Sequence, residues 1–574
     1  MAAQDSAGNE GPLSTIISAS TTLPLHDEFP IELESATNAS VTLADLDYDG
    51  DLEILAGAGE VYAIQPDGSE VYDGDGDIRT LGALTNTTKP GYWNAPAVGD
   101  VDLDGSPEVS AVSWLANMYL WNEFGEIESG WPRNLNVQSL ADPNPLSSVT
   151  MGDVDADGDM ELFVMCGRVL FGFHHTGAEI VDGDSNPATV GVIKIINTAY
   201  GYGTPALADM NGDGRPELIV GMRDKKLHVF DPVTWTEPPG FPFVTNGGAG
   251  SAGGEITSSP AVGDIDNDGQ PEIVFGCSDG RMYALNGDGT AAAGWPQGIQ
   301  LNEDLDSSPA LGDISGDGIP DVVVGASNGK LFAWKGNGIG LLQVSIKDAL
   351  NNNVAVRSSP ILVDIDANGV PEIIVGDQIG RLHGFYANGT LLPGFPIQTG
   401  NLIEGGPAAW DLDGDGLTEI VAESFDQKVY VWDTPWTFNA LASPWPMFHH
   451  DPRHTGLLTA PLFYQTGVPE SPIPGLKPFH LAQNRPNPFN PVTTIDWRIE
   501  RTPQGRDLLP VRLEVFTPTG RLVRVLVDRP LPVGDYQVIW DGTDQEGRKV
   551  SSGVYYYRMI SPETVENRKM VLVR

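Results

Sequence analysis

Cysteine, positive charge and long apolar runs are all scarce in this chain of 574 residues. The two cysteines, Cys166 and Cys277, could form one disulfide in a secreted chain, but the repeat register described below argues against this pairing. No stretch approaches the roughly 18 consecutive apolar residues of a membrane-spanning helix, so we expect no transmembrane segment. The first residues, Met1-Ala-Ala-Gln-Asp5, lack the basic and apolar regions of a signal peptide, so export would require a signal that they do not supply.

Basic residues are few and unevenly distributed. The chain has 32 Lys and Arg against 78 Asp and Glu, which gives a formal net charge of −46. Residues 475–574 contain 15 basic and 11 acidic residues, whereas residues 1–474 contain 17 and 67 and so carry a charge of −50. A surface with this charge repels phosphate backbones, so we expect no nucleic-acid partner and a high demand for cations.

One acidic repeat occurs eight times along the chain. Its fifth copy reads Pro260-Ala-Val-Gly-Asp-Ile-Asp-Asn-Asp-Gly-Gln-Pro-Glu-Ile-Val-Phe-Gly276. Successive copies begin 47 to 56 residues apart, a period that suits a four-stranded propeller blade with its loops.

Within a repeat, short apolar runs alternate with tight turns, as in Glu272–Gly276, Ser278-Asp-Gly280 and Arg281–Leu285. No helical periodicity interrupts this pattern. The sequence therefore predicts an all-β fold, a closed β-propeller with eight blades, or with seven blades and a split unit as the alternative. In either case the N-terminal strand must complete the last blade or cap the first.

Each repeat offers oxygen ligands at positions 1, 3, 5 and 9 of its loop. These side chains, in chain order, are Asp45, Asp47, Asp49, Glu53; Asp100, Asp102, Asp104, Glu108; Asp153, Asp155, Asp157, Glu161; Asp209, Asn211, Asp213, Glu217; Asp264, Asp266, Asp268, Glu272; Asp313, Ser315, Asp317, Asp321; Asp364, Asp366, Asn368, Glu372; and Asp411, Asp413, Asp415, Glu419.

Alternate carboxylates on a curled loop can converge on one hard cation. Position 6 is glycine in all eight loops, which permits the sharp turn, and position 7 varies freely, as expected where a backbone carbonyl is the ligand. Because magnesium retains more water, the pattern favours up to eight structural calcium ions. Loops four, six and seven each have one carboxylate fewer, so we expect them to bind more weakly.

The repeat resembles the FG-GAP or VCBS-type repeat of integrin α-subunit propellers and many bacterial surface proteins. The resemblance covers about residues 40–440. It implies a domain of structural calcium sites at one rim of the propeller rather than a catalytic metal.

The C-terminal region differs in composition and pattern. Five prolines lie between Ala460 and His480, which indicates a semi-rigid linker. Short predicted strands at 512–516, 521–527, 536–540 and 554–560 indicate an Ig-like β-sandwich. We therefore divide the chain into an N-terminal segment (1–25), a propeller (26–458), a linker (459–480) and a sandwich (481–574).

The sandwich resembles the FlgD Ig-like domain and the type A C-terminal sorting domain of type IX secretion. The resemblance is carried by Asn487-Pro-Phe-Asn-Pro491, Gly520-Arg-Leu-Val523, Trp540-Asp-Gly542, Ser552-Gly-Val-Tyr555 and Lys569-Met-Val-Leu-Val573. It implies a secretion or sorting machinery as partner, and a secreted or outer-membrane-surface location. A sandwich without a sorting role is the alternative.

Three other groups of side chains admit a structural and a functional interpretation. Cys166 and Cys277 occupy equivalent positions of blades two apart, so we expect two free, buried thiols. The histidine cluster consists of His449, His450 and His454; it either packs within the fold or binds a metal, and we favour packing. The tryptophans Trp93, Trp114 and Trp235 either stack on sugars or pack in the core, and we favour the core.

No catalytic constellation stands out from the repeats. The sequence therefore favours a non-enzymatic module that binds an extracellular glycan or protein. A ligand-free scaffold is one alternative. The other is a polysaccharide lyase, because rhamnogalacturonan lyases resemble this chain in their calcium propellers; its candidate residues would be Lys194, Arg223, Lys225, Lys226 and the histidine cluster.

Overall fold

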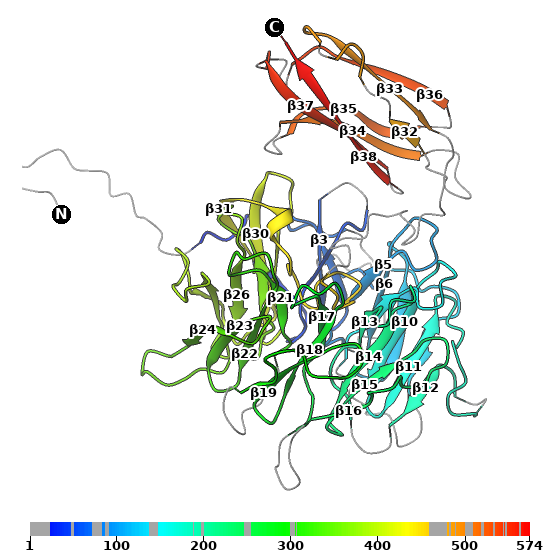
Figure 1. Cartoon of the computed structure of the whole chain (residues 1–574), viewed down its shortest axis with the longest axis vertical. Helices are drawn as coiled ribbons and strands as arrows, with labels where there is room; N and C mark the ends of the chain where they lie inside the picture. Colours follow the sequence, from blue (N-terminus) through cyan, green and yellow to red (C-terminus); the bar gives the residue numbers. More distant parts are fainter. Residues whose placement is uncertain are drawn as a thin grey trace, which may run out of the picture.

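The structure is a computed structural model of the whole chain (Figure 1). It describes residues 23–47, 51–71, 83–85, 91–136, 147–186, 189–196, 200–245, 254–298, 305 and 307–458, and in the C-terminal region 479–481, 484–487, 489–499, 509–517, 522–531, 534–543, 545, 548–550, 552–561 and 564–573. Apart from the short 3-10 helix η1 (Ala440–Ala442), all regular elements among these residues are strands.

Eight antiparallel sheets correspond to the eight repeats, and seven of them are simple meanders. The first four sheets are β2 (Thr42–Ala44), β3 (Glu53–Gly57), β4 (Val61–Ile64); β5 (Ala97–Gly99), β6 (Glu108–Val112), β7 (Asn117–Trp121), β8 (Arg133–Asn134); β9 (Thr150–Gly152), β10 (Glu161–Cys166), β11 (Val169–His174), β12 (Val192–Ile195); and β13 (Ala206–Ala208), β14 (Glu217–Met222), β15 (Lys226–Phe230), β16 (Phe243–Val244).

The other four sheets are β17 (Ala261–Gly263), β18 (Glu272–Cys277), β19 (Arg281–Leu285), β20 (Gln297–Gly298); β21 (Ala310–Gly312), β22 (Asp321–Ala326), β23 (Lys330–Lys335), β24 (Gly340–Ser345); β25 (Ile361–Val363), β26 (Glu372–Gly376), β27 (Arg381–Phe385), β28 (Ile397–Gln398); and β29 (Ala408–Trp410), β30 (Leu417–Ser424), β31 (Lys428–Thr437), β1 (Ile31–Glu32).

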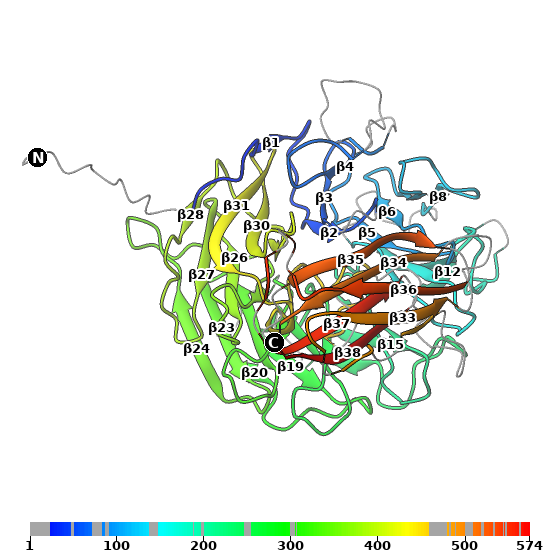
Figure 2. The same cartoon turned by 90° about the horizontal axis from the view of Figure 1, so that it is seen from above.

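Strand β1 closes the ring by completing the last blade. Ile31 pairs with Val429, and Leu33 N–H donates to the Gln427 carbonyl at 2.7 Å. In Figure 2 the blue β1 and β2 accordingly lie beside the yellow β30 and β31. The prediction of eight blades is confirmed, the seven-blade alternative is wrong, and the N-terminal strand completes the last blade rather than capping the first.

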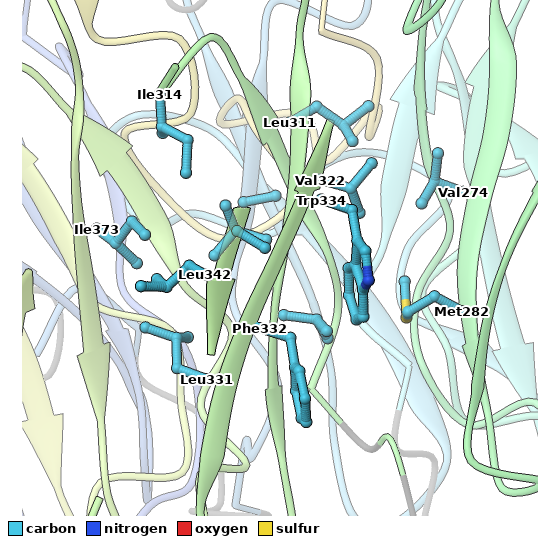
Figure 3. Close-up of a cluster of buried hydrophobic side chains, with 14 of the residues drawn as sticks. Val274, Met282, Leu311, Ile314, Val322, Leu331, Phe332, Trp334, Leu342 and Ile373 are labelled. Atoms are coloured by element: carbon cyan, nitrogen blue, oxygen red, sulfur yellow. The ribbon is translucent and has the colours of Figure 1, made fainter. Parts of the chain in front are cut away.

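The hydrophobic core lies between neighbouring blades. Each second strand is buried along its length because both faces of its sheet pack against other sheets, which explains the continuous apolar runs. Around blade six, Figure 3 shows Phe332 and Trp334 on the side of Met282 from blade five, and Leu331 on the side of Ile373 from blade seven.

A segment after the last blade, residues 445–458, fills the middle of the ring. Its carbonyls accept N–H groups from the middle residue of inner strands in six blades, at 2.7 to 3.0 Å: Val98, Met151, Leu207, Val262, Leu362 and Ala409. These N–H groups lie on the exposed edge of each inner strand, so the segment satisfies backbone donors that the sheets leave unpaired.

The C-terminal region forms two sheets around their own core. One sheet contains β32 (Phe479–Leu481), β33 (Thr493–Ile499) and β36 (Gly534–Trp540). The other contains β35 (Leu522–Leu531), β34 (Leu509–Phe516), β37 (Gly553–Ser561) and β38 (Thr564–Leu572). The four predicted strands are present, β33 and β38 were not predicted, and β32 begins two residues before the expected boundary. Among the described residues, no helix is long and apolar enough to cross a membrane.

Candidate metal centres in the acidic loops

The acidic loops all lie at the same rim of the propeller because each connects the inner strand of a blade to its second strand. Position 9 begins the second strand or follows its start closely, and its carboxylate is at most 4 % exposed in every blade. In seven loops one oxygen of this carboxylate accepts the position-2 N–H at 2.5 to 3.0 Å. The carboxylate therefore fastens the loop to the sheet.

The loops curl in the same way. In loops two to eight the position-6 glycine has φ between 84° and 105°, a conformation that favours glycine. Its N–H donates to the position-1 aspartate at 2.6 to 3.2 Å. The position-7 N–H donates to the position-5 side chain at 2.6 to 3.2 Å. These bonds orient the side chains toward the inside of the loop.

The predicted site residues are brought together by this curl. In the first three loops, ligand oxygens of three carboxylates lie within 4.8 Å of one another, as for Asp45, Asp47, Glu53 and for Asp100, Asp102, Glu108. The equivalent side chains of loops four to eight occupy the same positions of the same turn. Asp49 and Gly50 of the first loop lie outside the described residues.

Crowded carboxylates shift the acidity of position 9. Burial, followed by repulsion from neighbouring aspartates, raises the pKa of Glu108 to about 10, of Glu161 to about 9 and of Glu419 to about 8. The pKa of Glu217, Glu272 and Glu372 rises to about 7 for the same reasons. Negative charge held this closely favours a bound cation, and a donor set of carboxylate, amide and hydroxyl oxygens fits a hard ion such as calcium.

One group of loop-facing residues lies outside the repeat pattern and was not predicted from the sequence. The third-strand residue opposite position 9 reaches into several loops: Gln65 Nε2 donates to Asp47 Oδ2 at 3.0 Å, and His174 Nδ1 lies 2.9 Å from Glu161 Oε1. In loop six, Lys335 Nζ lies 2.7 Å from Asp317 Oδ2. Counting residues across each second hairpin would have identified these side chains, because antiparallel register fixes the pairing.

The histidine cluster is part of the central segment. His449, His450 and His454 are at most 2 % exposed. His449 Nε2 lies 2.8 Å from the Pro260 carbonyl oxygen, and His454 Nδ1 lies 3.0 Å from that of Val149. The packing interpretation is confirmed. Cys166 and Cys277 are both free and buried, as expected.

Aromatic and arginine side chains gather at the opposite rim, where second and third strands are joined. The Trp93 and Trp114 rings are 4.3 Å apart, and both residues are half-buried. On the next two blades, Arg168 lies over Tyr200 and Arg223 over Tyr202, at 5.3 and 5.4 Å from the ring centres. We call these six residues the aromatic rim. Trp235 instead packs partly buried beside Phe163, as expected for a core residue.

Three segments of the repeat region match a known protein family. Residues 209–275, 264–324 and 313–375 match the family described as FG-GAP-like repeat. The three matched segments begin at Asp209, Asp264 and Asp313, which are position 1 of loops four, five and six. The chain therefore contains three FG-GAP-like repeats within an all-β propeller. No curated protein matches the chain.

Two solved structures are similar to the chain at low identity. The V. cholerae biofilm matrix protein Bap1 is 13% identical, with a TM-score of 0.49, over 74% of this chain and 92% of that protein. BBS1N, from a complex with ARL6DN, is 14% identical, with a TM-score of 0.39, over 60% of this chain and 93% of that one.

Proposed function

We propose that this protein is an extracellular or cell-surface binding module whose propeller is stabilised by calcium in the acidic loops. The observation that carries the proposal is the buried position-9 carboxylate, which occurs in all eight blades beside alternating oxygen ligands in the sequence, on loops that curl alike in blades two to eight. Burying eight such carboxylates without a compensating charge would cost the folded state free energy. The FG-GAP-like repeats support the same conclusion.

The test is thermal unfolding of the full chain with EDTA, with calcium, and with calcium restored after EDTA. Since an ion that binds only the folded state stabilises it, we expect the midpoint to fall by about 10 °C or more in EDTA and to recover fully. Magnesium should restore only part of the loss because it binds such ligand sets poorly. Identical curves in all three conditions would exclude the calcium proposal.

The aromatic rim is the surface at which we propose that a glycan binds. Tyr200 is 37 % exposed, and Leu115, which follows Trp114 in the chain, is 62 % exposed, so the rim presents apolar area to solvent. Aromatic side chains and guanidinium groups together suit sugar rings, which have both apolar faces and hydroxyl acceptors. This rim is also the one without the acidic loops, so a ligand there would leave the calcium sites undisturbed.

A polysaccharide panel in calcium tests this assignment. We expect retention without unsaturated product, and we expect Trp114→Ala and Tyr200→Ala to weaken retention while Leu350→Ala, at an 82 % exposed position in the loop after β24, does not. Unsaturated product would instead establish a lyase. The burial of the histidine cluster weighs against that alternative. Neither retention nor product would shift the proposal to a protein ligand or a scaffold.

We further propose that residues 481–574 direct the protein to the cell surface through a sorting machinery. The two-sheet sandwich with its own core is compatible with a module that acts independently of the propeller. Fusion of this region to an exported reporter, in a bacterium that has type IX secretion, should place the reporter at the surface. A reporter that stays in the periplasm would favour a structural role.

A further inference from the structure

The second hairpin of each blade places one third-strand residue beside the acidic loop. Register pairs His174 with Glu161, Lys335 with Asp321 and Asp433 with Glu419, so the same position faces position 9 in blades three, six and eight. This residue is outside the loop sequence itself. It can nevertheless change the charge that the loop presents to a cation.

In blade six this residue carries a positive charge of its own. Lys335 Nζ donates to Asp317 Oδ2 at 2.7 Å, and Asp317 is the position-5 ligand of the loop. The two side chains are 32 % and 38 % exposed, so the ammonium group sits at the loop rather than extending freely into solvent. Among the described loops, this is the one contacted by a lysine.

The sixth loop differs from the others in two further ways. Position 3 is Ser315, which leaves three carboxylates, so with Lys335 the ligand set carries a charge of −2, against −4 in loops one, two, three, five and eight and −3 in loops four and seven. Position 9 is Asp321, one methylene shorter than glutamate. Its Oδ2 accepts the Ser315 N–H at 2.8 Å, while the position-2 N–H of Ile314 turns to the Gly312 carbonyl.

We propose that Lys335 is a built-in cation that replaces calcium in the sixth loop, so that the propeller binds one calcium ion fewer than it has acidic loops. The ammonium group neutralises Asp317 and holds the loop in the same curl that a metal ion would support elsewhere. Calcium affinity decreases when the ligand set carries less negative charge. This inference rests on the proposed calcium function, because it assigns which of the loops needs the ion.

The first experiment measures how many calcium ions bind to each full-length chain, by isothermal titration calorimetry and by elemental analysis. We expect Lys335→Gln to bind one more equivalent than the wild-type chain. Glutamine is the residue at the equivalent place in blade one, where Gln65 contacts Asp47. Lys330→Gln, at the other end of β23, removes the same charge away from the loop and should leave the count unchanged. An unchanged count in Lys335→Gln would overturn the role of Lys335.

The second experiment compares position 5 in two loops. We expect Asp268→Asn in loop five to lose one equivalent or to weaken it roughly tenfold, since a charged ligand is removed. Asp317→Asn in loop six should leave the count unchanged. Equal losses in the two variants would overturn the inference while the calcium function stands. A wild-type chain that binds no calcium would instead exclude the proposed function itself.

Discussion

At the scale of single residues, the position-9 carboxylate connects the sheet of each blade to its acidic loop. Glu272 shows the arrangement: one oxygen accepts the Ile265 N–H at 3.0 Å, and the side chain is 1 % exposed. Burial and the aspartates of the loop raise its pKa to about 7. The same charge that would bind calcium is therefore unfavourable when no cation is present.

We expect Glu272→Gln to destabilise the protein when calcium is present and to stabilise it when calcium is removed. The amide oxygen can still accept the Ile265 N–H, but the ligand charge is lost, so we expect the free energy of unfolding to fall by about 2 kcal/mol in calcium. The pKa of Glu272 is higher in the folded chain than in the unfolded chain, so at pH 8 its negative charge disfavours the folded state. In EDTA, removing this charge should therefore raise the free energy of unfolding by about 1 kcal/mol. Chemical unfolding in both conditions measures the pair of values, with the exposed Glu126→Gln as control. A loss of equal size in both conditions would contradict the expectation.

The buried histidines of the central segment give the fold a pH dependence. Burial, with His449 nearby, lowers the pKa of His454 from 6.5 to about 4, although the Asp451 carboxylate opposes the shift. Between these values the unfolded chain binds a proton that the folded chain does not. Stability contributed by the neutral imidazole is therefore complete above about pH 6.5 and is lost progressively as the pH falls toward 4.

His454→Asn should remove most of this dependence. Asparagine tolerates the left-handed backbone at this position (φ 56°) and can donate to the Val149 carbonyl. Between pH 7 and pH 5, in saturating calcium, we expect the variant to lose about 2 kcal/mol less unfolding free energy than the wild-type chain. Urea unfolding at the two pH values provides the measurement. An identical loss in both proteins would show that His454 does not titrate on unfolding.

At the scale of secondary-structure elements, two strand edges decide whether the ring is closed. Strand β1 covers the outer edge of β31, and residues 445–458 cover the inner edges of six blades. An uncovered edge is a site for pairing with another chain. Both elements belong to the ends of the propeller sequence, so the ring is closed only when its first and last parts have met.

Leu33→Ala should weaken this closure. Leu33 is 3 % exposed, packs between the first and last blades, and donates its N–H to Gln427. We expect a loss of about 3 kcal/mol in unfolding free energy from the cavity, together with greater aggregation on mild heating as β31 becomes uncovered. Leu25→Ala, at a 42 % exposed position of the same segment, should cost less than about 1 kcal/mol. Differential scanning calorimetry with light scattering would show whether the two variants differ.

At the scale of the whole molecule, charge is the dominant feature. The net charge of −46 includes the 29 carboxylates of the acidic loops, which the fold gathers at one rim. Their mutual repulsion opposes the compact state unless cations bind or salt screens it. Calcium and ionic strength should therefore act on the same repulsion, the first locally and the second over the whole surface.

Sodium chloride should accordingly stabilise the protein mainly in EDTA. Raising the salt from about 0.05 M to about 0.5 M shortens the screening length several-fold, so we expect the unfolding midpoint in EDTA to rise by several degrees. With calcium bound, the same change should raise it far less. Equal responses in EDTA and in calcium would indicate that the loop carboxylates are not the source of the repulsion.

The amino-acid sequence by itself determined the all-β class, the eight repeats with their acidic loops and the separation of the two cysteines. These features follow from a repeat of fixed period, because each unit places its turn glycines and apolar strands by local rules that hold in every copy. The position-9 carboxylate could be assigned in the same way, since it is the first residue of a strand whose partner is only a loop away.

Only the tertiary structure decided how the ring is closed and which side chains lie beside the loops. Strand β1 pairs with β31 across about 400 residues, and no local pattern specifies a partner at that distance. The sequence allowed the histidine cluster to be a surface metal site, and only the structure shows that its segment, residues 445–458, is held in the ring by hydrogen bonds from the inner strands. Lys335 is 18 residues from Asp317 in sequence, and only the hairpin register brings its charge into the sixth loop.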